Sequence, residues 1–130
     1  EDICNSNTFN TPMPIPSVSL DDPEHCIDYW RGMVWINYSY MVQQGLRDYG
    51  FIEEANHVAD ATIAGIAHWY MREGSIFEIY DPQNILSPWE LERKGKVIKP
   101  EEYFARLAPV RDFGWSSTLY VAMVMEREER

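Results

Sequence analysis

The sequence predicts an all-α fold, and three observations support that prediction. Two long segments repeat apolar residues at the helical period of 3.6, each ends at a glycine, and the link between them is very short. We therefore expect helices near residues 30–49, 53–72 and 116–128, with no strands beyond a short hairpin near residues 75–80. A chain of 130 residues is long enough for one small domain with a real core.

Residues 1–28 are expected to form an irregular lead-in. The stretch TPMPIPSVSLDDP holds four prolines in thirteen residues, and proline interrupts helices because it lacks a backbone N–H. The segment should run extended over a larger body, held against it by three apolar side chains, those of Ile15, Val18 and Leu20.

Residues 29–73 are expected to form an antiparallel helical hairpin. Gly50 is the expected C-cap of the first helix and Gly74 that of the second, and the short connection places the two helices side by side. The apolar stripe of the first helix comprises Val34, Trp35, Tyr38, Met41, Val42, Leu46 and Tyr49. The stripe of the second helix comprises Ala55, Val58, Ala59, Thr62, Ile63, Ile66, Ala67 and Tyr70.

Residues 74–100 follow as a long loop, and residues 101–130 as closing helices. The stretch PEEYFARL predicts a short helix near Pro100, because proline and acidic residues favour a helix N-terminus. The final helix should bury an apolar face and end in the charged stretch EREER; that face is formed by Leu119, Ala122 and Met123. We find no internal repeat.

Composition excludes several classes of function. The chain has 21 acidic and 11 basic residues, a net charge of −10, so we expect no nucleic-acid partner. It has no membrane-length apolar run and no signal peptide, and a cytoplasmic location is expected. Because it begins at Glu1 rather than methionine, we expect a processed or excised piece. Cys4 and Cys26 fit no zinc spacing; we expect no metal or other cofactor, and a disulfide between them is left open.

Two stretches are candidates for chemistry. In SIFEIYDPQN, Glu78 lies between aliphatic and aromatic neighbours, as either an outward residue of a short strand or a carboxylate held in a cleft. In DYWRGMVW, aromatic side chains and an arginine crowd the start of the first helix. Aromatic faces stack on sugar rings and arginine donates paired hydrogen bonds, whereas the alternative is a hydrophobic staple with a structural arginine.

Taken in order, three segments resemble the C-terminal part of the glycoside hydrolases of family 63 and the trehalase group. They are PSVSLDDPEHCIDYWRGMVWINYSYMVQQGLRDYGFIEEA, GSIFEIYDP and DFGWSSTLYVAMV, and together they are more specific than any one alone. The resemblance implies an (α/α)6 barrel, a ring of helical hairpins, of which residues 1–130 would be the C-terminal segment. Residues 74–100 would then be the catalytic loop.

The same resemblance implies an inverting glycosidase acting on α-linked sugars, whether a glucosidase, a trehalase-like enzyme or a mannosylglycerate-type enzyme. Glu78 would be its general base, and the substrate would be bound by Tyr29, Trp30, Arg31, Gly32, Trp35, Asn37, Trp115 and Ser116. The expected partners are a carbohydrate and the remaining N-terminal part of the enzyme. Since one helix of a hairpin starts where its partner stops, Glu78 should lie at the same end as Tyr29 and Trp30.

The sequence also departs from the family pattern. Met33 replaces the usual proline, and Gln83-Asn84 replaces the common Thr-Gly. No segment matches the family's general acid, an Asp far upstream. Asp81 is too close to Glu78, and three further aspartates belong to a different motif, Asp21, Asp22 and Asp28. The chain alone should therefore be inactive.

Two alternatives belong to other functional classes. One is a non-catalytic helical module that is derived from such a barrel and binds sugars or a protein. The other is a generic helical domain in which every aromatic side chain belongs to the core. The second alternative predicts that Glu78 is exposed and that Trp30 is fully buried, away from any cleft.

Overall fold

The computed structural model describes residues 2–91, 93 and 109–129. Its α-helices are α1 (Ile36–Asp48), α2 (Ile52–Glu73) and α4 (Gly114–Glu128), with short 3-10 turns at Asp2–Cys4, Tyr29–Arg31 and Pro88–Glu90. Within these residues the chain forms isolated β-bridges but no strand. The predicted all-α class is confirmed.

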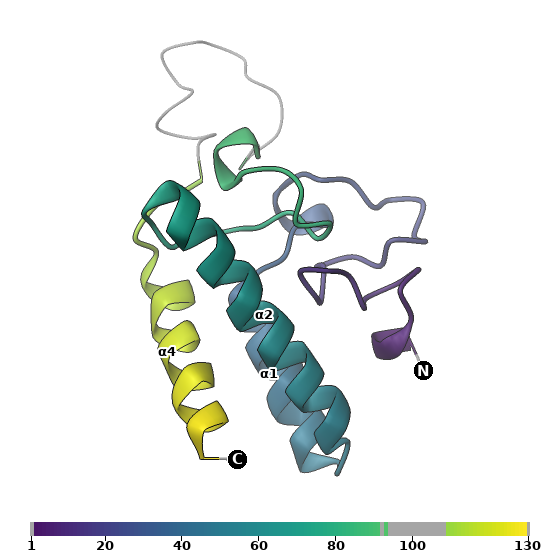
Figure 1. Cartoon of the computed structure of the whole chain (residues 1–130). Coiled ribbons are helices and arrows are strands. Elements are labelled where there is room, and N and C mark those ends of the chain that lie inside the picture. The colour runs from purple at the N-terminus through teal and green to yellow at the C-terminus, as the bar shows by residue number, and fades with distance from the viewer. Residues whose placement is uncertain (1, 92, 94–108, 130) are drawn as a thin grey trace.

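The two long helices form the expected antiparallel hairpin, and α4 lies along both of them (Figure 1). Gly50 makes the tight link with φ of 83°, a conformation that glycine adopts without a steric penalty. The backbone N–H of Phe51 then donates to the carbonyl of Leu46, 2.8 Å away, which closes the end of α1. A hairpin with a third helix beside it agrees with part of an all-α toroid.

The first helix begins at Ile36, six residues later than the sequence indicated. Val34 is extended instead, and it exchanges two backbone hydrogen bonds with Tyr80, at 2.9 and 3.1 Å. These bonds with a distant segment replace those that a helical turn would supply. Val34 and Trp35 matched the helical stripe because both are buried, but they are buried from an extended segment.

The buried face of α1 also differs from the predicted stripe. Tyr38, Met41 and Tyr49 are exposed, whereas the polar residues Ser39 and Gln43 are fully buried. Each buried polar side chain has a donor that finds a partner: Ser39 Oγ donates to the carbonyl of Pro14 at 3.2 Å, and Gln43 Nε2 to Glu126 at 3.1 Å. The stripe on α2 is buried or half-buried as predicted, apart from the exposed Tyr70.

The lead-in is irregular apart from one short turn, and it packs on the hairpin. Met13 and Ile15 are buried, whereas Val18 and Leu20 are half-buried. A Cβ atom on Gly65 would lie 2.3 Å from Met13 Sδ, so glycine on α2 makes room for this side chain. The Met13 N–H also donates to the carbonyl of Pro82, 3.0 Å away, which joins the lead-in to the loop after α2.

The last helix starts at Gly114, two residues before the predicted position, and its apolar face packs on the core with Met123 fully buried. The short helix expected near Pro100 lies outside the described residues. None of the helices just described has the length and apolar character that a bilayer span requires.

Candidate functional site

Glu78 lies in the loop after α2, and the loop is fixed on both sides of it. Phe77 forms a β-bridge with Arg111, and Tyr80 forms one with Val34. The Glu78 N–H donates to the carbonyl of Val110 at 3.0 Å. Only 2% of Glu78 is exposed. The loop therefore holds a carboxylate inside the molecule rather than on an outer edge.

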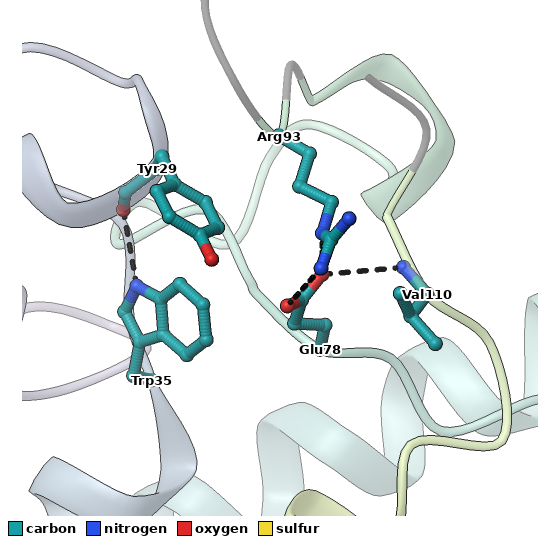
Figure 2. A network of polar contacts seen from close by, with 5 residues as sticks. All are labelled: Tyr29, Trp35, Glu78, Arg93 and Val110. Atoms are coloured by element: carbon teal, nitrogen blue, oxygen red, sulfur yellow. Dashed lines mark hydrogen bonds and ion pairs between the residues drawn. The ribbon is translucent and has the colours of Figure 1, made fainter. Parts of the chain in front are cut away.

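The Glu78 carboxylate is paired with Arg93 (Figure 2). Arg93 Nε donates to Oε2, Nη2 donates to Oε1 at 3.2 Å, and the Val110 N–H approaches Oε2 at 3.5 Å. Both oxygens are thus engaged by one planar guanidinium, the two-point geometry that arginine favours.

Tyr29 also contacts Arg93. Its ring centre lies 5.9 Å from Arg93 Cζ, within range of a cation–π contact. Its backbone has φ of 46°, which is uncommon for an aromatic residue, and its carbonyl accepts a 3.0 Å hydrogen bond from Trp35 Nε1. The buried indole thus holds Tyr29 in its unusual conformation (Figure 2).

Trp30 stacks on Trp35 with ring centres 3.6 Å apart and planes 2° from parallel. Trp35 is buried, but 37% of Trp30 is exposed. Trp30 also lines an open pocket of about 390 Å³ with Asp28, Tyr29 and Arg31. A buried Glu78 and an exposed Trp30 are the reverse of what the generic-domain alternative predicted.

Arg31 lines this pocket, and Gly32 follows it directly in the chain. The Arg31 side chain is largely exposed and lies 3.9 Å from the exposed Glu24 carboxylate. A Cβ on Gly32 would fall 2.4 Å from the carbonyl oxygen of Cys26, so only glycine allows this close backbone approach.

The remaining predicted residues lie elsewhere. Asn37 and Trp115 line a separate pocket of about 340 Å³ on α1 and α4, and Ser116 is buried. The eight predicted binding residues therefore fall into two groups. Among the described residues, the contacts given above join only the group around Tyr29, through Arg93, to Glu78.

Asp81, the neighbouring carboxylate, has a structural role. It is buried, and it accepts backbone N–H groups from Gln83 at 3.1 Å and from Ile85 and Leu86 at 2.9 Å each. These bonds close the turn that follows the Glu78 segment, as aspartates commonly do in loops.

Two contributors escaped the sequence analysis. Arg93 lies in the polar stretch ELERKGK, which has no periodic pattern, so nothing in the sequence distinguished it from its charged neighbours. Trp89 packs edge-on against Phe77 at 5.1 Å, and the Arg111 guanidinium lies 5.6 Å from the centre of the Trp89 ring. The position of Trp89 just after a proline in a loop was the only available signal.

The described residues contain no cluster of side chains that could hold a metal ion. The thiols of Cys4 and Cys26 are free, which answers the question of a disulfide that the sequence left open.

Comparison with known proteins gives concordant matches. The mannosylglycerate hydrolase of Rubrobacter radiotolerans is 36% identical over 78 residues, which are 59% of this chain and 16% of that protein. Mannosylglycerate hydrolase MGH1 of Selaginella moellendorffii is 38% identical over 69 residues, 52% of this chain and 13% of that protein. The chain thus spans less than a fifth of these curated relatives.

A solved structure, an uncharacterized conserved protein from Thermus thermophilus, matches 87% of this chain and 22% of its own, with a TM-score of 0.55 and 31% identity. The family described as the mannosylglycerate hydrolase MGH1-like glycoside hydrolase domain matches residues 1–116, nearly the whole chain. On this match, this chain belongs to the MGH1-like glycoside hydrolase domain family.

Proposed function

We propose that this chain contributes the general base, Glu78, to an inverting glycoside hydrolase that acts on an α-linked sugar. The observation that carries the proposal is the position of Glu78. It is a buried carboxylate in a loop fixed on both sides, and its partner Arg93 lies beside the aromatic ring of Tyr29. In this reaction Glu78 takes a proton from water while the water oxygen attacks the anomeric carbon. A second carboxyl group protonates the leaving oxygen, and the sugar is released with inverted configuration.

The sugar is proposed to bind against the exposed face of Trp30. Tryptophan faces stack on the C–H faces of sugar rings, and the pocket beside Trp30 also offers the Arg31 guanidinium for hydroxyl or carboxylate groups. Two relatives are named mannosylglycerate hydrolases, which makes mannosylglycerate the first substrate to test and α-glucosides and trehalose the comparisons.

The general acid is proposed to come from outside residues 1–130. Inversion needs two carboxyl groups ~6.5–9.5 Å apart on opposite sides of the sugar. Two aspartates of this chain already accept backbone hydrogen bonds. Asp81 accepts three N–H groups, and Asp22 accepts the N–H of Glu24 at 2.7 Å. Because the chain spans only 16% of its Rubrobacter relative, the rest of such a domain could supply the acid. Residues 1–130 alone should then show no glycosidase activity.

The test is a chimera in which this chain replaces the matching segment of the Rubrobacter radiotolerans mannosylglycerate hydrolase. We expect the chimera to hydrolyse mannosylglycerate and Glu78→Gln to lower kcat by ~10²–10⁴-fold with little change in KM, because the aromatic surface is untouched. NMR of the sugar released early in the reaction should show the anomer opposite to that of the substrate.

Glu128→Gln is the matched control. It makes the same chemical change at the far end of α4, where the Glu128 carboxylate lies on the surface beside Arg127. Unchanged turnover by Glu78→Gln would remove Glu78 from the mechanism. Release of the same anomer as the substrate would overturn inversion.

A further inference from the structure

Arg93 is the residue that holds the Glu78 carboxylate. It donates to both oxygens, and it is itself largely buried, with 20% of its side chain exposed. A two-point arginine–carboxylate contact fixes the rotation of the carboxylate as well as its position, which a single charge such as lysine does not.

The hydrogen bonds leave the two oxygens of Glu78 unequal. A carboxylate has about four acceptor positions, two on each oxygen. Oε2 receives Arg93 Nε and, more weakly, the Val110 N–H, whereas Oε1 receives only Arg93 Nη2. Among the described residues, Oε1 is therefore the oxygen with an acceptor position still open.

We propose that Arg93 is a positioning residue, which anchors Glu78 through Oε2 and presents Oε1 to the water that attacks the sugar. This inference rests on the proposed general-base role of Glu78. To that role the inference adds two details. Oε1 is the carboxylate oxygen that receives the proton, and Arg93 is the side chain that leaves Oε1 available for it. Positioning of this kind matters because displacing a reacting group by about 1 Å can cost ~100-fold in rate.

Arg93 is held in turn by two aromatic residues, Tyr29 and Trp35. The Tyr29 ring lies beside the Arg93 guanidinium at 5.9 Å, and Trp35 fixes Tyr29 through its carbonyl at 3.0 Å. Figure 2 shows these side chains in sequence, from the indole to the carboxylate. Tyr29 therefore supports the base through Arg93.

The test uses the chimera defined above. We expect Arg93→Ala to lower kcat by ~10–100-fold with KM within about twofold, because substrate binding is kept while the base loses its orientation. Added guanidinium at millimolar concentration should restore part of the kcat of Arg93→Ala. It should restore nothing in Glu78→Gln, which lacks the carboxylate. Arg93→Lys should behave more like the alanine variant than like the parent, since lysine keeps the positive charge but cannot donate to both carboxylate oxygens in the planar two-point geometry of arginine.

Arg72→Ala is the matched control, because this arginine also lies over an aromatic ring, that of Trp69 at 5.5 Å, but on α2. Thermal unfolding of each variant separates loss of fold from loss of rate, and Arg93→Gln replaces the alanine variant if that variant does not fold. Guanidinium rescue of kcat in a folded Arg93 variant supports the inference.

Two results would overturn it, and they are distinguishable. Undiminished kcat in Arg93→Ala, with Glu78→Gln inactive, would remove Arg93 from the mechanism and leave the general base in place. Undiminished turnover in Glu78→Gln would overturn the proposed function and this inference together.

Discussion

Tyr80 is a buried residue that links the Glu78 loop to the core and makes the stability of the fold depend on pH. Its hydroxyl accepts the N–H of Phe77 at 2.9 Å, three residues earlier in the segment that carries Glu78. Tyr80 has no exposed surface, and burial raises its pKa above the usual value, while the hydrogen bond from Phe77 opposes this shift. The pKa of Tyr40 is also raised, chiefly by its hydrogen bond to Glu126 and then by burial.

The sign of the pH effect follows from these raised pKa values. Below about pH 10 both tyrosines are neutral in the folded and unfolded chains, and their full contribution to stability is present. Above it the unfolded chain loses these protons first, so stability should fall by up to ~1.4 kcal/mol per pH unit for the buried Tyr80. The partly exposed Tyr40 should add a smaller slope, because solvent screens its interaction with Glu126. Denaturant unfolding of the 130-residue chain from pH 8 to pH 11 measures this slope.

Tyr80→Phe isolates the contribution of the buried hydroxyl. At pH 8 the variant should be less stable by ~1–3 kcal/mol, because the buried Phe77 N–H loses its acceptor. Above pH 10 the deficit should shrink, since the variant no longer has that proton to lose. Parallel stability curves for the variant and the parent across this range would contradict the argument.

At the scale of elements, the loop from residue 81 to residue 91 is organised by one side chain. Asp81 gathers three backbone N–H groups, after which Ser87 begins a short 3-10 turn with a capping box completed by Glu90. That turn places Trp89 against Phe77, next to Glu78. The conformation of the proposed catalytic loop thus depends on Asp81, although this carboxylate performs no chemistry in the proposed mechanism.

Asp81→Ala should lower the free energy of unfolding by ~1–3 kcal/mol, because it leaves N–H groups without their acceptor. Asp81→Asn should have an intermediate effect, since an amide has one acceptor oxygen in place of two. Denaturant unfolding gives the stability, and tryptophan fluorescence follows the packing of Trp89. An alanine variant as stable as the parent would show that the turn forms without the carboxylate.

The elements were predictable from the sequence where local pattern determines them. The 3.6-residue apolar repeat and the glycines at the ends predicted α1 and α2, because helical hydrogen bonds join residues that are close in the sequence. The predicted start of α1 was wrong because Val34 bonds to Tyr80, 46 positions away, and no local pattern reports such a contact. Glu78 was proposed from its motif, whereas Arg93 was not, since its contact with Glu78 arises only when the loop folds back on itself.

At the scale of the whole molecule, several large apolar side chains are exposed on the helices. On α1 and α4 they include Tyr38, Met41, Trp115, Val121 and Met125, with Tyr49 just after α1. Next to α1, an apolar groove of about 280 Å³ is lined by Ile3, Val42, Gly45, Leu46, Tyr49 and Phe51. A polar network joins another side of α1 to α4, where Glu126 accepts hydrogen bonds from Tyr40, Gln43 and Gln44.

This distribution agrees with the proposal that the chain is part of a larger toroid. Helical stripes that face solvent in the isolated chain would face neighbouring hairpins in the ring, and an exposed apolar patch of this kind marks a contact surface. Both sides of α1 would then be covered, the polar side by α4 and the apolar side by the rest of the enzyme.

Met41→Lys tests this proposal, because Met41 is 63% exposed at the middle of α1. In the 130-residue chain the substitution should change the unfolding free energy by no more than about 0.5 kcal/mol, as is usual for surface positions. In the chimera the same lysine would be buried without a partner, and stability should fall by ~2 kcal/mol or more. Glu128→Lys, at the exposed end of α4, is the control and should be neutral in both proteins. Equal tolerance of Met41→Lys in the two proteins would show that this face of α1 stays in water after assembly.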